Sequence, residues 1–108
     1  MTGFSRRPHD VDVARRFLIA CAHRENHELP TYGEVAAQYG GIARAGGPVL
    51  SSIARDCELA GEPDLTALVV ERRSRLPGVF RGQQVIAGTP SETKWHAELA
   101  RIRSHDWR

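Results

Sequence analysis

The chain has few of the residues that cross-link small proteins or hold metals. Its only cysteines are Cys21 and Cys57, and two cysteines at this separation make no metal-ligand spacing. Both fall at apolar positions of helical patterns, where a free thiol behaves as a small hydrophobic group. We therefore predict two buried, unpaired thiols and no metal site.

Long apolar segments and catalytic motifs are also missing. No apolar stretch approaches the roughly 20 residues that a membrane-spanning helix needs. The sequence has no phosphate-binding loop, nucleophile elbow or paired-carboxylate motif. His96-Ala97-Glu98 matches only half of a nucleotide deaminase signature, and His23 and His27 lack a third ligand at a recognisable distance. We expect no membrane insertion, no cofactor and no enzymatic activity.

The N-terminus shows no secretory signal, because Arg6 and Arg7 are followed by polar Pro8-His9-Asp10 and not by an apolar core. We expect a cytoplasmic protein in which residues 1–9 are flexible. With 108 residues, 41% of them hydrophobic and 26% charged, residues 1–108 suit one domain with a modest core.

Arginine is plentiful, with 14 arginines against one lysine, and the net charge of +2 hides a local division. Residues 56–71 carry five acidic residues and no base, whereas residues 72–81 carry four arginines and no acid. This pattern predicts a positive hairpin or loop on a less positive body. A solvated loop without a partner is the plainer interpretation, since charge runs are usually solvated.

Helical periodicity and capping signals predict three helices in the first half of the chain. The first begins with Asp10 as N-cap and runs to about Arg24. The second opens with a capping box, Thr31 to Glu34, and ends at Gly40-Gly41. The third becomes regular near Gly47, because proline is tolerated in a first turn, and it closes at Gly61.

The second half of the sequence predicts two strands followed by a helix. The apolar run 65–70 is typical of a buried strand, which we pair with residues 83–86 across the arginine-rich turn containing Pro77-Gly78. A capping box at residues 89–92, with Pro90 in the first turn, predicts a last helix over 90–105. The expected fold is a small α+β winged helix-turn-helix domain: three N-terminal helices, a short β-hairpin as the wing, and a C-terminal helix.

Three segments together resemble a known family. Residues 31–36 (T-Y-G-E-V-A), 44–47 (R-A-G-G) and 65–70 are similar to the C-terminal winged-helix domain of alkylguanine DNA alkyltransferases and alkyltransferase-like proteins. The resemblance implies that a small-residue helix enters the minor groove of DNA. It also implies that Arg44 fills the space left by a flipped base and Tyr32 helps to rotate the nucleotide. Ala45, Gly46 and Gly47 would form the surface that faces the groove.

The chain departs from the family where the chemistry takes place. In the register set by Val69-Val70, the acceptor cysteine is replaced by Thr66 and its histidine by Ala67. A neutral threonine hydroxyl without a base is a poor nucleophile at pH 7. This register excludes alkyl transfer, and loss of the histidine places a sensor of alkylated bases last among the alternatives.

Small residues at the start of the third helix also have a physical use, since a helix approaches a sugar-phosphate wall closely only where its side chains are small. The alternatives are close helix packing through Gly46 and Gly47, and a Tyr32 ring that only covers the core.

We predict a non-enzymatic protein that binds double-stranded DNA through residues 44–55 and an arginine-rich wing. The residues expected at DNA are Tyr32, Arg44, Ala45, Gly46, Gly47, Ser51, Ser52, Arg55, Arg72, Arg73 and Arg75. The competing hypothesis is an adaptor or inhibitor, for example a phage or bacterial regulator of a host protein. Such a protein would use the same fold to bind a protein partner, with Phe80, Trp107 and the arginines as anchors.

Overall fold

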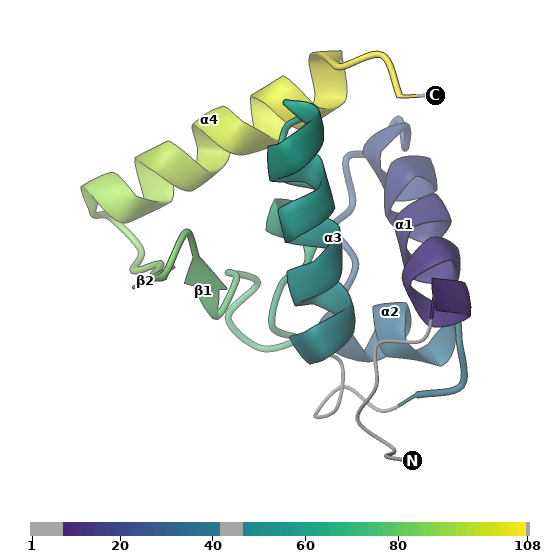
Figure 1. Ribbon diagram of the computed structural model, residues 1–108. Coiled ribbons are helices and arrows are strands. Elements are labelled where there is room, and N and C mark those ends of the chain that lie inside the picture. Colours follow the sequence, from purple (N-terminus) through teal and green to yellow (C-terminus); the bar gives the residue numbers. More distant parts are fainter. Residues whose placement is uncertain (1–7, 42–46, 108) are drawn as a thin grey trace.

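The computed structural model describes residues 8–41 and 47–107, and it has a small α+β fold (Figure 1). Within those residues the elements follow the expected order of three helices, a hairpin and a last helix, with one short 3-10 helix between. They are α1 (Pro8–Ala22), α2 (Tyr32–Ala37), α3 (Gly47–Ala60), η2 (Leu65–Leu68), β1 (Val79–Phe80), β2 (Gln83–Gln84) and α4 (Pro90–Ser104).

The core lies where α1, α3 and α4 meet around η2. The helices α1 and α3 pack against each other, and each of the three contacts η2. Figure 1 shows the hairpin and α1 on opposite sides of α3, with α4 across the C-terminal end of α3. Each of these four elements contributes side chains that are buried from water, and this burial is the main stabilising term of a domain this small. They include Ala14, Leu18, Ile53, Cys57, Leu65, Leu68, Trp95, Leu99 and Ile102.

The predicted strand over residues 65–70 is wrong, because its first four residues form η2. Asp64 caps this turn by accepting hydrogen bonds from the Thr66 amide (2.9 Å) and the Thr66 hydroxyl (2.6 Å). Only Val70 pairs as a strand would, in an isolated parallel bridge with Thr31. A run buried on all sides has no solvent-facing period, so its apolar pattern does not distinguish strand from helix.

The hairpin is therefore shorter and later than predicted. β1 pairs with β2 in antiparallel register, Val79 opposite Gln84 and Phe80 opposite Gln83. The turn is Arg81-Gly82, where both residues have positive φ (54° and 77°), and not Pro77-Gly78. Turns with two such residues match the twist of paired strands, which favours a tight hairpin at this point.

Helix boundaries follow the sequence signals with two corrections. The capping box of α2 is confirmed, since the Glu34 amide donates to Thr31 Oγ1 (3.1 Å) and the Thr31 amide donates to Glu34 Oε1 (2.8 Å). The box expected at α4 is wrong, because Glu92 accepts instead from the Gly88 amide (2.9 Å). The helix α1 begins at Pro8 and not at Asp10, so residues 8–9 are helical.

The rest of the predicted flexible N-terminus, residues 1–7, lies outside the described residues. In residues 8–41 and 47–107, no helix combines the length and apolar character needed to cross a membrane.

Candidate nucleic-acid interface

The start of α3 is open to solvent. Gly47 is exposed, and among the described residues a Cβ atom added to it would meet no heavy atom within 4 Å, apart from its chain neighbours and its own helix. A glycine required for close helix packing would have a neighbour at that distance. Close packing therefore does not explain Gly47. The predicted contacts Arg44, Ala45 and Gly46 lie outside the described residues.

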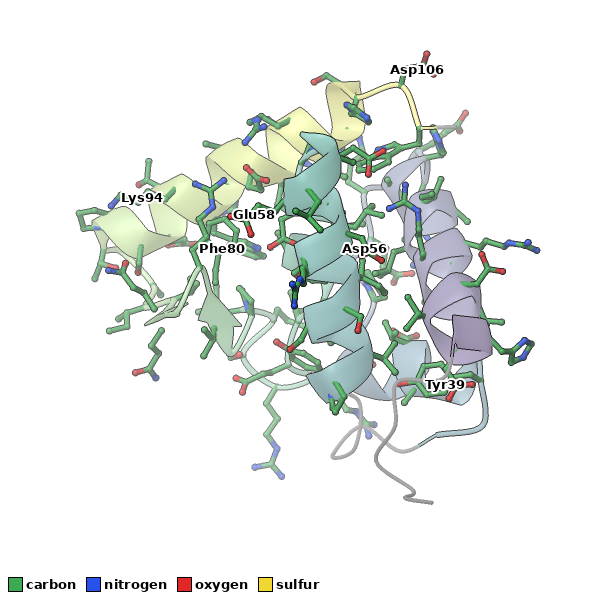
Figure 2. The ribbon with its side chains drawn as sticks, viewed as in Figure 1. Tyr39, Asp56, Glu58, Phe80, Lys94 and Asp106 are labelled. Atoms are coloured by element: carbon green, nitrogen blue, oxygen red, sulfur yellow. The ribbon has the colours of Figure 1, made fainter. Side chains whose placement is uncertain are left out.

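Beyond Gly47, α3 has two unlike sides. Ser51 and Arg55 are exposed, whereas Ser52, on the other side, is half-buried. Figure 2 shows Asp56 and Glu58 leaving α3 in opposite directions, with Glu58 toward the hairpin and α4. Ser51 and Arg55 line the surface on the hairpin side, and Ser52 does not. The helix therefore separates two residues that the sequence placed together.

A shallow groove runs between α3 and the hairpin, and we call it the α3–hairpin groove. Its walls come from α2, α3, η2 and the hairpin, so segments far apart in the sequence meet there. The side chains along it are mostly small or apolar. The lining residues are Tyr32, Gly47, Leu50, Ser51, Ala54, Asp64, Thr66, Ala67, Gly78, Val79, Phe80, Arg81 and Gly82.

Tyr32 lies at one end of this groove. Its ring packs against the core, as the alternative interpretation expected, and its hydroxyl oxygen accepts a hydrogen bond from the Gly78 amide (3.1 Å). Tyr32 also lines a second hollow, which contains Arg72 and Arg75 together with the acidic residues Glu28, Glu34 and Glu71. The tyrosine therefore joins the groove to the surface that carries the arginines.

The arginines belong to a compact loop, residues 71–78, which we call the arginine loop. The Glu71 amide donates to the Leu76 carbonyl oxygen (2.9 Å), and the Arg75 amide donates to the Glu71 carbonyl oxygen (2.9 Å). Arg75 has a positive φ of 60°, and its guanidinium donates to the Leu29 carbonyl oxygen (3.0 Å). Arg75 therefore secures the loop to the segment before α2.

Arg72 and Arg73 are exposed, and neither forms an ion pair with any of the described residues. The carboxylate of Glu71, just before them, accepts from the Ser74 hydroxyl (3.0 Å). Arg72 lines the same hollow as Tyr32. An exposed, unpaired arginine is well suited to a phosphate, because its planar fork donates two hydrogen bonds at once.

The other end of α3 is different in charge. Glu58, Glu62 and Asp64 line a hollow there with Arg55 and Arg101. Arg15 pairs with Glu62 (3.2 Å) across this end. Arg55, although exposed, is thus surrounded by acidic side chains, which weakens its attraction for an anion. Among the described residues, the arginine and lysine side chains without an ion pair are most concentrated in the arginine loop. They are Arg72, Arg73 and Arg75 there, Arg55 on α3, and Lys94 and Arg103 on α4.

The three side chains considered as nucleophiles, Thr66, Cys21 and Cys57, are bonded or buried. The Thr66 hydroxyl lies in the groove and donates to Asp64, and the residue after it, Ala67, has no basic side chain. Cys57 is buried, and desolvation raises the pKa of its thiol despite the Leu65 amide and the charge of Arg15. A thiol with a raised pKa is a weak nucleophile. Cys21 is likewise buried, so both thiol predictions are confirmed.

The aromatic anchors of the adaptor hypothesis are wrong. Phe80 and Trp107 are both buried in the core, and the Trp107 indole donates to the Ile102 carbonyl oxygen (2.9 Å). Glu98 on α4 is a buried carboxylate that contacts Arg81 (3.1 Å), and its burial and this contact were not predicted. A single acidic residue on an amphipathic helix usually faces water, so no local signal marks it.

In comparisons with known proteins, no family model, curated protein or solved structure matches this chain.

Proposed function

We propose that this chain is a non-enzymatic, double-stranded DNA-binding protein of the winged-helix, alkyltransferase-like type. The open start of α3 carries the proposal. Among the described residues, none outside the helix itself would contact a Cβ at Gly47, and a helix without a side chain at that point can approach the sugar-phosphate wall of a DNA groove. Backbone amides at a helix start also favour a phosphate nearby.

The charges support a duplex as the ligand. Arg72 and Arg73 have no ionic partner among the described residues, and Tyr32 connects their surface to the groove at Gly47. In the proposed complex, α3 and Arg44 approach the groove of DNA while the arginine loop contacts the phosphates beside it. The β1–β2 hairpin is the wing, and it forms the far wall of the α3–hairpin groove.

We also propose that the protein has no catalytic activity. Thr66 and Ala67 stand where the resembling family has its acceptor cysteine and histidine, and the Thr66 hydroxyl is already bonded to Asp64 (2.6 Å). A carboxylate that accepts this bond holds the hydroxyl away from the groove's other polar groups. We therefore assign Thr66 a structural role in capping η2 and assign the protein a binding function.

Titration of a fluorescent duplex at several salt concentrations tests the proposal. If three or four arginines neutralise phosphates, the logarithm of affinity should fall against the logarithm of salt with a slope of about −3 to −4. The double variant R72A/R73A should lower that slope by about two. R103A is the matched control, because Arg103 is exposed in the last turn of α4, far from the start of α3 (Figure 1).

Binding to duplex that ignores salt, or no binding at all, would contradict the proposal. So would equal losses in R72A/R73A and R103A, because charge anywhere on the surface would then suffice.

The adaptor alternative retains one observation in its favour. Leu59, Val79 and Ile86 are large apolar side chains that are more than half exposed, and exposed apolar groups are common at protein interfaces. A pull-down from nuclease-treated lysate separates the two functions. A stoichiometric protein that remains bound, and that L59S or V79S releases, would favour the adaptor.

A further inference from the structure

The turn of the hairpin contains a backbone conformation that arginine rarely adopts. Arg81 has a φ of 54° and is followed by Gly82 at 77°. Residues with a Cβ are disfavoured at positive φ, and asparagine, aspartate or glycine usually occupy such turns. An arginine there needs compensation from its surroundings.

The compensation comes from α4. Glu98 is 3% exposed, so its carboxylate is nearly free of water. Its Oε1 accepts from the Arg81 guanidinium (3.1 Å) and from the Arg101 guanidinium (2.7 Å), and its Oε2 accepts from the Asp64 amide (2.7 Å). A buried carboxylate is stable only when it is paired and hydrogen-bonded. The groups around Glu98 therefore depend on one another.

We propose that Glu98 is a positioning residue that acts through Arg81. Their ion pair holds the turn in its left-handed conformation and so fixes the β1–β2 hairpin as a wall of the α3–hairpin groove. Arg81 is then a support for the hairpin and not a contact to phosphate. The effect on DNA binding rests on the proposed function, but the effect on the hairpin does not.

One further contact shows that Arg81 packs against the protein. Its guanidinium lies 5.0 Å from the centre of the Phe80 ring, on which it stacks. Phe80 and Val85, on either side of the turn, are buried and attach the hairpin to the core. The hairpin is thus attached by apolar side chains, and its turn is set by the ion pair.

The decisive comparison is between R81A and R81G. Both remove the ion pair, but alanine keeps the strained Cβ whereas glycine adopts positive φ freely. We expect amide hydrogen exchange at Gly82 and Gln83 to be roughly tenfold faster in R81A than in R81G. R81G should exchange within about twofold of the wild-type protein. Amides of α1 serve as the internal reference for any global loss of stability.

E98Q provides the second arm. It should speed exchange at the turn when Arg81 is present and should have little effect in the R81G background, because the strain that Glu98 offsets is then gone. Equal exchange in R81A and R81G, or an E98Q effect that persists unchanged with R81G, would overturn the proposal.

The DNA titration separates this inference from the proposed function. R81G should lower the affinity and the salt slope less than R72A/R73A does, because the Arg81 guanidinium is paired with Glu98 whereas Arg72 and Arg73 have no ionic partner among the described residues. A loss of affinity in R81G as large as that in R72A/R73A would make Arg81 a phosphate contact and would refute its role as a support. If the wild-type protein does not bind DNA, the exchange comparison still decides whether Glu98 positions the hairpin.

Discussion

The indole Nε1 of Trp95 donates a 2.7 Å hydrogen bond to the carbonyl oxygen of Ala67. Both residues are buried, so the bond joins α4 to the middle of the core without competition from water. Such a bond matters mainly because of what its loss leaves behind, which is a buried carbonyl without a donor.

W95F should therefore lower the free energy of unfolding by about 1–3 kcal/mol for the unsatisfied carbonyl, with a further loss from the smaller ring. Denaturant unfolding followed by circular dichroism measures this change. K94A, on the exposed face of the same helix, should stay within about 0.5 kcal/mol of the wild-type protein. Similar values for the two variants would show that the bond is energetically unimportant.

Gly47 offers a test of the open helix start. G47A should leave the stability unchanged or raise it by up to about 1 kcal/mol, because the added Cβ meets nothing within 4 Å. G47L should also fold, but its side chain should keep DNA away and weaken duplex binding at least tenfold. A60L, at the exposed opposite end of α3, is the control. Unfolding of G47A would restore the packing explanation.

Arg44 and Arg24 should behave differently in the DNA titration. Arg44 lies outside the described residues, and its role rests on the family resemblance. Arg24 follows the C-terminal end of α1, and its guanidinium lies 5.8 Å from the centre of the Phe17 ring and 3.7 Å from the Glu28 carboxylate. R44A should weaken duplex binding more than R24A does. Equal losses would show that the assignment of the groove is wrong.

The two thiols should react slowly in the folded protein. Burial raises the pKa of both Cys21 and Cys57, which lowers the fraction of thiolate, and burial also blocks reagents. Ellman's reagent should modify both cysteines rapidly in guanidinium chloride and far more slowly in native buffer. Rapid modification of one thiol per chain in native buffer would contradict the buried position of that residue.

Glu92 should make stability depend on pH in the acid range. The Gly88 amide, and then the His96 side chain, lower the pKa of Glu92 from its ordinary 4.5. A lowered pKa in the folded state stabilises the protein above the unfolded value, and this contribution is lost as the pH falls through the folded value. E92Q should therefore flatten the loss of melting temperature below about pH 4.5. E25Q, at an exposed position, should not, and parallel curves for the two variants would contradict this assignment.

The sequence predicted best what is local. The capping box of α2 needs only Thr31 and Glu34, three residues apart, and both bonds form as expected. The last helix, predicted over 90–105 from Pro90 and its neighbours, is also confirmed as α4, and its buried residues Trp95, Leu99 and Ile102 lie at helical spacing. In both cases the residues that decide the structure are neighbours in the chain.

The errors arise where distant residues decide. Three helices bury the run 65–70, so its hydrophobic residues show no period that separates strand from helix. The Asp64 cap then favours a 3-10 turn over residues 65–68. The expected cap of α4 failed because the Glu92 carboxylate bonds to the preceding glycine instead. The role of Glu98 depends on Arg81 and Asp64, 17 and 34 residues away. Of the candidate site, the open Gly47 and the exposed Arg72 and Arg73 were predictable from composition, but the groove was not.

Both ends of the arginine loop are fastened to consecutive residues. The Val70 carbonyl oxygen accepts from the Tyr32 amide (3.3 Å) beside the bridge to Thr31, and the Gly78 amide donates to the Tyr32 hydroxyl (3.1 Å). Between these two ends, Arg75 adds a third attachment by donating to the Leu29 carbonyl oxygen. Arg72 and Arg73 take part in none of these attachments, so the charge at these two positions can vary independently of the fold.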